Sequence, residues 1–184
     1  NGPGATNLVT GVAQAKAAFS PLISIAGAIS SEHSGKDAFQ EVDQQLLFEP
    51  ITKKAFSVKK IKSIPAIFRK VFDLSLSLRQ GPVHVNLPRN ILSSKTNFLD
   101  FTTYKPKKNK KIKDGDLIKI LQLLASSKKP VIIAGGGVKN AQIHAEVVKF
   151  AKNFQIPIVS SAGHADAIPF NEKLYAGQMG PRGN

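Results

Sequence analysis

Two kinds of hydrophobic pattern alternate along the chain. Short continuous apolar runs are typical of strands that are buried on both faces of a parallel sheet. Such runs occur at Pro21–Gly27, Pro130–Gly137 and Ile156–Ser161, and Ile51–Val58 is a further candidate strand. Pro82–Pro88 (PVHVNLP) is a further buried strand, with His84 and Asn86 between its apolar residues. Helical spacing of apolar residues is found at Thr6–Phe19, Val42–Phe48, Ile64–Leu78, Asp116–Ser126 and Ala141–Phe154. This alternation predicts an α/β fold with parallel sheets flanked by helices.

The first residues, NGPGATNLVTG, indicate a tight turn that leads directly into a helix. The Gly-Pro-Gly sequence is typical of a turn, and Thr6 or Asn7 is expected to cap the helix that follows. A domain seldom starts in this way, and the last residues, GQMGPRGN, add no closing helix to the final strand. We therefore expect the chain to be a segment of a longer protein.

A polar, basic stretch separates the two halves of the pattern. Residues 90 to 114 contain a proline and a dense lysine cluster, which is typical of a linker between domains. The lysines of this cluster are Lys105, Lys107, Lys108, Lys110, Lys111 and Lys113. The predicted organisation is a first domain at 1–92, a linker at 93–115 and the beginning of a second domain at 116–184.

Composition restricts the classes of function. The chain has 184 residues, is 42% hydrophobic and contains no cysteine, so it can bury a core but forms no disulfide or thiolate metal site. This suits a cytoplasmic protein. The formal net charge is +14, but the lysines gather in the linker without interleaved aromatic residues, which argues against nucleic-acid binding. No apolar run reaches the roughly 20 residues that span a bilayer, so no membrane partner is expected.

Two loops are candidate ligand sites, because open α/β sheets bind ligands beyond the carboxyl ends of their strands. In PVIIAGGG, the turn at Gly135 and Gly136 leads into a helix, as in nucleotide-binding turns, although the dinucleotide spacing is incomplete. A plain strand-to-helix turn explains it equally well. In DAFQEVDQ, Phe39, Gln40 and Glu41 end a loop that follows a buried strand, and an aspartate that starts a helix is the alternative explanation. The four histidines show no metal-ligand spacing, and no metal ligand is predicted.

A family resemblance extends these observations. NGPGATNLVTG, DAFQEVDQ, ITKKAF, RQGPVHVNLPRN and KPVIIAGGG occur in an order and spacing that resembles thiamine diphosphate enzymes of the acetolactate synthase group. The resemblance covers essentially the whole chain. It implies that residues 1–92 are the later part of a pyrimidine-binding domain and that residues 116–184 are the first half of a central domain.

The resemblance also implies cofactors and site residues. Thiamine diphosphate and Mg²⁺ are expected, with the activating glutamate and the Mg²⁺ ligands outside this segment. Pro3 and Asn7 would contact the pyrimidine ring, and Gln40 would reach the reaction site beside Phe39. Lys53 occupies the place of a Thr-Lys pair in the family. Active sites of the family form between subunits, so a homodimer or homotetramer is implied.

Within this group, three features favour a resemblance to sulfoacetaldehyde acetyltransferase. They are Asn1 before Gly-Pro-Gly, Arg89 in VNLPRN, and the segment GHADAIPFNEKLYAG. That enzyme converts sulfoacetaldehyde and phosphate to acetyl phosphate and sulfite. Arg89 would hold an anionic substrate, because guanidinium binds sulfonate or phosphate through two parallel hydrogen bonds. A salt bridge at the strand end is the alternative role for Arg89.

ITKKAF and GATNLVTG favour acetolactate synthase instead, which joins two 2-oxoacids with loss of CO₂. In that case FAD would lie along the chain as a structural cofactor. Its contacts would be Arg79, Gly135, Gly136, Ser160 and Ser161. Another thiamine diphosphate lyase or decarboxylase and a non-enzymatic α/β binding module are the remaining alternatives.

Overall fold

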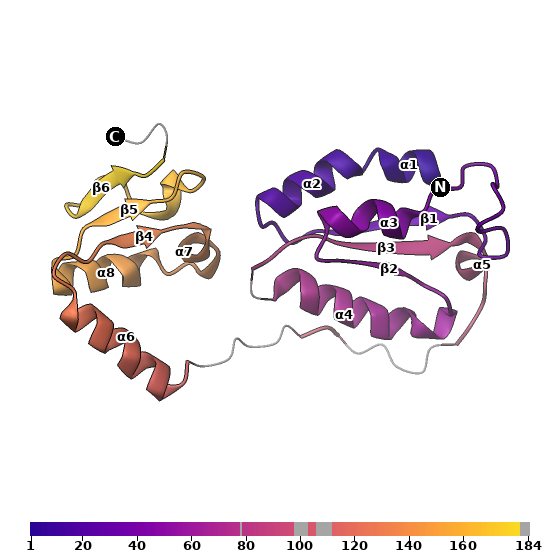
Figure 1. Ribbon diagram of the computed structural model, residues 1–184. Coiled ribbons are helices and arrows are strands. Elements are labelled where there is room, and N and C mark those ends of the chain that lie inside the picture. Colours follow the sequence, from indigo (N-terminus) through magenta and orange to yellow (C-terminus); the bar gives the residue numbers. More distant parts are fainter. Residues whose placement is uncertain (78, 98–102, 106–111, 181–184) are drawn as a thin grey trace. The chain divides into compact units, whose positions relative to one another are not determined.

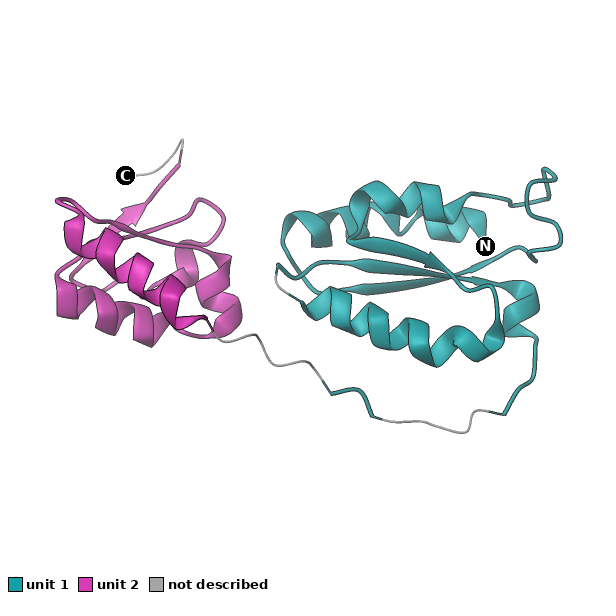
Figure 2. Ribbon diagram, turned by 60° about the horizontal axis from the view of Figure 1, so that its bottom comes forward, with its two compact units in different colours: residues 1–109 teal, residues 110–184 magenta. Residues whose placement is uncertain are grey.

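The computed structural model describes residues 1–77, 79–97, 103–105 and 112–180. The chain divides into two compact units, unit 1 (Asn1–Asn109) and unit 2 (Lys110–Asn184), which Figure 2 colours separately. The division falls inside the predicted linker. Of the clustered lysines, Lys105 and Lys113 are described, whereas Lys107, Lys108, Lys110 and Lys111 lie outside the described residues.

Unit 1 is built on a three-stranded parallel sheet. Its order is β1 (Ile23–Ala28), β3 (Val83–Pro88) and β2 (Lys54–Ser57), so the central strand comes last in the sequence. The helices are α1 (Gly2–Thr6), α2 (Val9–Ala17), α3 (Gln44–Phe48), α4 (Ile64–Leu76) and α5 (Arg89–Leu92), with single 3₁₀ turns at Glu49–Ile51 and Ile61–Ser63. In Figure 1, α1, α2 and α3 cover one face of the sheet and α4 covers the other. The predicted α/β class is confirmed.

The central strand β3 is buried on both faces, although its sequence VHVNLP contains two polar residues, His84 and Asn86. Val83 and Val85 pack into a core cluster with Val71 of α4, and His84 stacks on Phe48 of α3 on the other face. Side chains on a strand alternate between the two faces of the sheet, and here both faces are covered. Its two polar side chains are therefore buried rather than exposed to solvent.

The opening segment differs from its prediction. Gly2-Pro3-Gly4 is the first part of helix α1, with Asn1 as its N-cap residue, rather than a separate turn. Proline is compatible with a first helical turn because its missing N–H needs no partner there. Thr6 does not cap the following helix: its hydroxyl donates back to the Pro3 carbonyl at 2.8 Å. Two short helices, α1 and α2, thus replace the single helix predicted from Thr6.

Unit 2 contains a second parallel sheet in the order β4 (Ile132–Ala134), β5 (Ile158–Ser160) and β6 (Tyr175–Gln178). Its helices are α6 (Asp114–Ser126), α7 (Gly136–Ala141) and α8 (His144–Phe154), and a 3₁₀ turn spans Ala165–Ala167. Ala134, Ala151 and Ile158 form the centre of its core. The strand predicted at Pro130–Gly137 is shorter than expected because α7 begins at Gly136, and β6 was not predicted.

One residue of the predicted linker lies against unit 1. The ring of Tyr104 stacks on Phe72 of α4 at a centroid distance of 5.0 Å, and its hydroxyl donates to Asp73 Oδ1 at 3.1 Å. The linker therefore has a fixed point on α4 rather than being solvated throughout. Throughout the described part of the chain, no helix has the length and apolar character needed to cross a membrane.

Candidate functional site

A cleft of about 480 Å³ in unit 1 lies where β1 and β3 end. Ile29 and Ser30 line it directly after β1, and Arg89 and Asn90 line it directly after β3. Parallel sheets bind ligands at this edge, and the volume falls within the range of small-molecule sites. The cleft is therefore the candidate functional site of unit 1.

Three residues proposed from the sequence line this one cleft: Phe39, Gln40 and Arg89. The side chain of Phe39 is 88% exposed, so its ring is available to a ligand instead of filling the core. Arg89 is also exposed, and within the described residues its guanidinium has no ion-pair partner. The fold thus brings together residues that lie about 50 positions apart in the sequence, while their catalytic roles stay predictions.

The start of the chain contacts the loop that carries Gln40. The Asn1 side-chain amide donates to Gln40 Oε1 at 3.5 Å, and the Gly2 N–H donates to the Gln40 carbonyl at 3.3 Å. A Cβ atom on Gly2 would lie 2.5 Å from that carbonyl oxygen and 2.7 Å from Val42 Cγ2. Only glycine permits this approach, so the opening segment has a structural link to the cleft.

Pro3 and Asn7 occupy different places. Both are exposed on α1, with Asn7 at its C-terminal end, and neither is among the described residues that line the cleft. The contact of these two residues with a pyrimidine ring therefore stays a prediction from the family resemblance.

The loop between β1 and α3 is held by two polar side chains, Asn90, which sequence reasoning missed, and Glu41, which it placed in the candidate loop without a role. Asn90 accepts a hydrogen bond from Ser31 N–H at 3.1 Å and donates to Ser31 Oγ at 2.9 Å. Glu41 accepts from Gly35 N–H at 2.5 Å and from Ala38 N–H at 3.0 Å. These backbone hydrogen bonds, with Gly35 contributing most, lower the pKa of the Glu41 carboxyl. Asn90 lies just after the end of a strand, and this position is the sequence signal by which it could have been found.

Asp43 is the aspartate that starts a helix, which was the alternative explanation of DAFQEVDQ. Its carboxylate accepts a hydrogen bond from Leu46 N–H at 2.9 Å and caps α3. The segment thus contains both a helix cap and two cleft-lining residues, Phe39 and Gln40.

Lys53 lies at the opposite end of the sheet, before β2. Its ammonium donates to carbonyl oxygens at the end of α4 and just beyond: Leu74, Ser77 at 2.8 Å and Arg79 at 3.0 Å. Partial burial lowers its pKa. A cation there satisfies carbonyls that have no partner within the helix and interacts favourably with the helix dipole. This geometry gives Lys53 a structural role, away from the cleft.

A buried polar layer lies between the sheet and α3. His84 is fully buried, its Nδ1 is 2.9 Å from Ser24 Oγ, and its ring stacks on Phe48 at a centroid distance of 3.8 Å. Burial lowers the pKa of His84 to about 4, because a charged imidazolium would lose its hydration there. The imidazole is therefore neutral at physiological pH, and this histidine is a core residue.

In unit 2, the glycine turn lies where β4 ends, and Ser160 and Ser161 lie where β5 ends. Ser160 Oγ is 2.7 Å from the Tyr175 hydroxyl. The imidazole of His164 packs directly on Gly136, where a Cβ would lie 2.5 Å from His164 Nε2. The His164 side chain thus covers the glycine turn on this side. Arg79 belongs to unit 1, where its guanidinium lies 3.4 Å from the Phe19 ring centroid.

Comparison with known protein families gives matches in both units. A profile described as "Thiamine pyrophosphate enzyme, N-terminal TPP binding domain" matches residues 1–47, and one described as "Thiamine pyrophosphate enzyme, central domain" matches residues 117–184. The chain belongs to the thiamine pyrophosphate enzymes. Within this family, Phe39 and Gln40 fall in the matched part of the N-terminal domain, whereas Arg89 and Asn90 lie beyond it.

Curated relatives show which thiamine pyrophosphate enzymes the chain is similar to. The chain is 38% identical to the probable acetolactate synthase large subunit of Methanocaldococcus jannaschii, 37% to the acetolactate synthase large subunit of Buchnera aphidicola subsp. Schizaphis graminum, and 33% to the acetolactate synthase isozyme 3 large subunit of Escherichia coli. Each alignment covers 100% of this chain and 32 or 33% of the relative. The chain therefore spans about a third of the length of these relatives.

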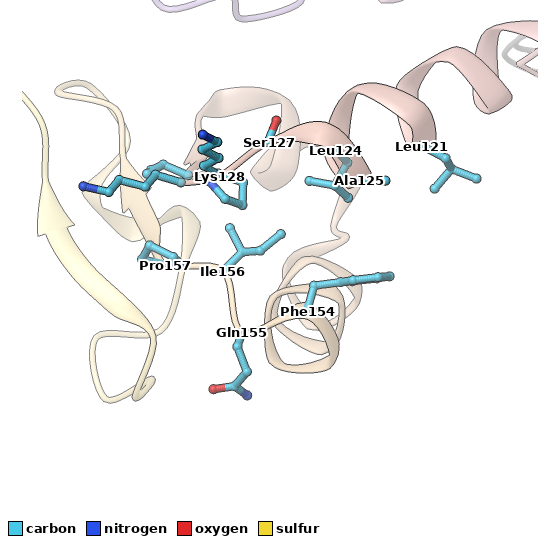
Figure 3. A pocket seen from close by; sticks show the side chains of 12 residues that line it. Leu121, Leu124, Ala125, Ser127, Lys128, Phe154, Gln155, Ile156 and Pro157 are labelled. Atoms are coloured by element: carbon cyan, nitrogen blue, oxygen red, sulfur yellow. The ribbon is translucent and has the colours of Figure 1, made fainter.

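A second hollow, of about 790 Å³, lies in unit 2 between α6, α8 and the residues that precede β5. Figure 3 shows Leu124, Phe154 and Ile156 among the side chains around it. It is lined by Val131 before β4 and Pro157 before β5, so it lies at the amino edge of the sheet. Open parallel sheets bind ligands at the carboxyl edge, so this hollow is not a candidate active site.

Proposed function

We propose that the protein carrying this chain is the large subunit of an acetolactate synthase, which joins two 2-oxoacids with loss of CO₂. The observation that carries the proposal is the similarity, over the whole chain, to acetolactate synthase large subunits of archaea and bacteria. The cleft supports it, because Phe39, Gln40 and Arg89 line one small-molecule site.

The sequence first favoured sulfoacetaldehyde acetyltransferase, and the relatives support the alternative better. The three features that favoured it were Asn1, Arg89 and the GHADAIPFNEKLYAG segment. In the structure, Asn1 bonds to Gln40 and His164 closes the glycine turn, so two of these features have structural roles in this chain. Arg89 remains compatible with either activity, because 2-oxoacids, sulfonates and phosphate are all anions.

The volume and the lining of the cleft suit a small aromatic ring. Amide groups of Asn1 and Gln40 lie beside the exposed Phe39 ring and supply hydrogen-bond donors and acceptors. When bound, thiamine diphosphate supplies a carbanion and an electron sink. The proposed role of Gln40 is to hold and orient a reacting oxygen, and that of Phe39 is to exclude water from it.

Other components belong to the same proposal. Mg²⁺ is expected with the diphosphate, although the described residues contain no cluster of three or more side chains able to hold a metal ion. FAD stays a proposed structural cofactor of the acetolactate synthase reading, and the packing of His164 on Gly136 does not test it. A homodimer or homotetramer in the cytoplasm is the proposed state.

The substrates decide between the two activities. The purified protein that carries this chain is expected to form acetolactate from pyruvate when thiamine diphosphate and Mg²⁺ are supplied. It should release little sulfite from sulfoacetaldehyde and phosphate. Acetolactate is measured by its conversion to acetoin, and sulfite with a thiol-exchange dye. Sulfite release with formation of acetyl phosphate, and no acetolactate, would reverse the assignment.

Arg89 is predicted to bind the carboxylate of the substrate. Arg89→Ala should raise KM for pyruvate about 10-fold or more, since a hydrogen bond to a charged group contributes roughly 1.5–3 kcal/mol. Arg89→Lys should recover only part of this, because the ammonium cannot form two parallel hydrogen bonds. Lys95→Ala removes an exposed cation outside the cleft and serves as the charge control. If Arg89 has a structural role, Arg89→Ala will instead lower Tm at unchanged KM.

A further inference from the structure

The loop between β1 and α3 carries Phe39 and Gln40 but has almost no hydrophobic support. All side chains from Ser31 to Asp37 are exposed. Gly35, Asp37 and Gln40 have φ values of 75°, 53° and 63°, in the left-handed region that non-glycine residues seldom adopt. Because exposed side chains cannot fix such a backbone by packing, polar contacts must hold it in place.

Glu41 supplies most of these contacts from the end of the loop. One carboxylate oxygen accepts from Gly35 N–H and the other from Ala38 N–H, at 2.5 and 3.0 Å. The Lys36 backbone and the Ser34 side chain also form hydrogen bonds that lower its pKa. The carboxylate thus closes the stretch from Ser34 to Ala38 into a ring that ends next to Phe39 and Gln40. Hydrogen bonds to an ionised acceptor are roughly twice as strong as neutral ones.

The other end of the loop is attached independently. The Asn90 side chain makes two hydrogen bonds to Ser31, and the Gly2 N–H donates to the Gln40 carbonyl. These contacts fix the loop at its first residues and at Gln40. Between them, two backbone hydrogen bonds form local turns, from His33 N–H to the Ser30 carbonyl and from Glu41 N–H to the Ala38 carbonyl. The Glu41 carboxylate is the side-chain group that bonds to residues 34–38.

We propose that Glu41 is a positioning residue for catalysis: its carboxylate holds residues 34–38 so that Phe39 and Gln40 face the cleft. It acts through Gln40 and does not itself touch the substrate. The catalytic part of this inference rests on the proposed function, whereas the structural part does not.

The test replaces Glu41 in the protein that carries this chain. Glu41→Gln keeps the size of the side chain but turns one acceptor oxygen into a donor, which cannot pair with a backbone N–H. We expect kcat for acetolactate formation to fall about 10-fold or more, with KM changed by less than about threefold, because one charge-assisted hydrogen bond is lost. Amide hydrogen exchange in residues 34–41 should become about 10-fold faster or more, and exchange in β3 should not change.

Glu32→Gln is the matched control, because it removes the same charge from an exposed position in the same loop. It should leave both kcat and the exchange rates as in the wild type. Glu41→Asp is the second variant, used if Glu41→Gln does not fold. It keeps two acceptor oxygens on a shorter side chain and should recover part of kcat.

The outcomes distinguish the structural role of Glu41, its catalytic role and the proposed function from one another. If exchange in residues 34–41 is unchanged in Glu41→Gln, Glu41 does not hold the loop and the proposal is wrong. If exchange rises while kcat stays at the wild-type value, the residue is structural and not positioning. If the wild-type protein makes no acetolactate, the proposed function fails, while the exchange data still decide whether Glu41 holds the loop.

Discussion

Gly2→Ala is expected to destabilise the protein by about 1–3 kcal/mol and to lower kcat with it. The added Cβ would lie 2.5 Å from the Gln40 carbonyl oxygen and 2.7 Å from Val42 Cγ2, closer than atoms approach without movement. Because one neighbour is backbone, relief requires a shift of the loop that carries Gln40, and overpacking of this kind typically costs 1–3 kcal/mol. Urea unfolding gives the stability change, and steady-state kinetics give kcat.

Gly4→Ala provides the comparison within the same helix. Gly4 is exposed, and a Cβ there would meet no atom within 4 Å. Alanine at this position should stabilise the protein by about 0.5–1 kcal/mol, because it favours the helix over the unfolded chain. If both substitutions have the same effect, helix propensity alone governs α1, and the contact between Gly2 and the loop carries no weight.

Acid is expected to remove stability through His84 between about pH 6.5 and pH 4. In the unfolded chain this histidine binds a proton near its usual pKa of 6.5, whereas in the fold burial lowers its pKa to about 4. The unfolded state therefore binds more protons across this window, so the free energy of unfolding falls as the pH falls. A difference of about 2.5 pH units corresponds to about 3 kcal/mol. The stability is complete above pH 6.5.

Urea titrations at pH 7.0, 5.5 and 4.5 measure this loss. His84→Leu should weaken the dependence on pH, even if it lowers stability at pH 7 by leaving Ser24 without its partner. His144→Gln, at an exposed position, should keep the wild-type dependence. An equal slope in wild type and His84→Leu would show that other groups, such as the carboxylates, cause the acid sensitivity.

The sequence was sufficient for elements whose hydrophobic pattern reflects their environment. β3 was visible as a short segment rich in valine and leucine between Gly81 and Pro88, and both of its faces are covered. β6 was not visible, since Tyr175–Gln178 (YAGQ) has four residues and no apolar run. It becomes a strand only because β5 offers it a free edge, and pairing with a distant strand leaves no local pattern.

The candidate site shows the same limit. The position of DAFQEVDQ after a buried strand pointed to Phe39, Gln40 and Glu41. Only the family resemblance gave roles to Phe39, Gln40 and Arg89, because spacing alone did not distinguish them from a helix start or a salt bridge. Asn90 was not selected and Glu41 received no role, because their partners belong to a loop whose left-handed conformation the sequence does not reveal. Gly2 was interpreted as part of a turn, whereas its requirement for glycine comes from contact with a loop about 40 residues away.

The placement of the tyrosines makes the two units separately observable. The chain contains no tryptophan and two tyrosines. Tyr104 stacks on Phe72 in unit 1, and the Tyr175 hydroxyl pairs with Ser160 in unit 2. The intrinsic tyrosine fluorescence of this chain can therefore follow each unit without an added label. In a Tyr175→Phe variant the remaining fluorescence comes from Tyr104 in unit 1, and in a Tyr104→Phe variant it comes from Tyr175 in unit 2.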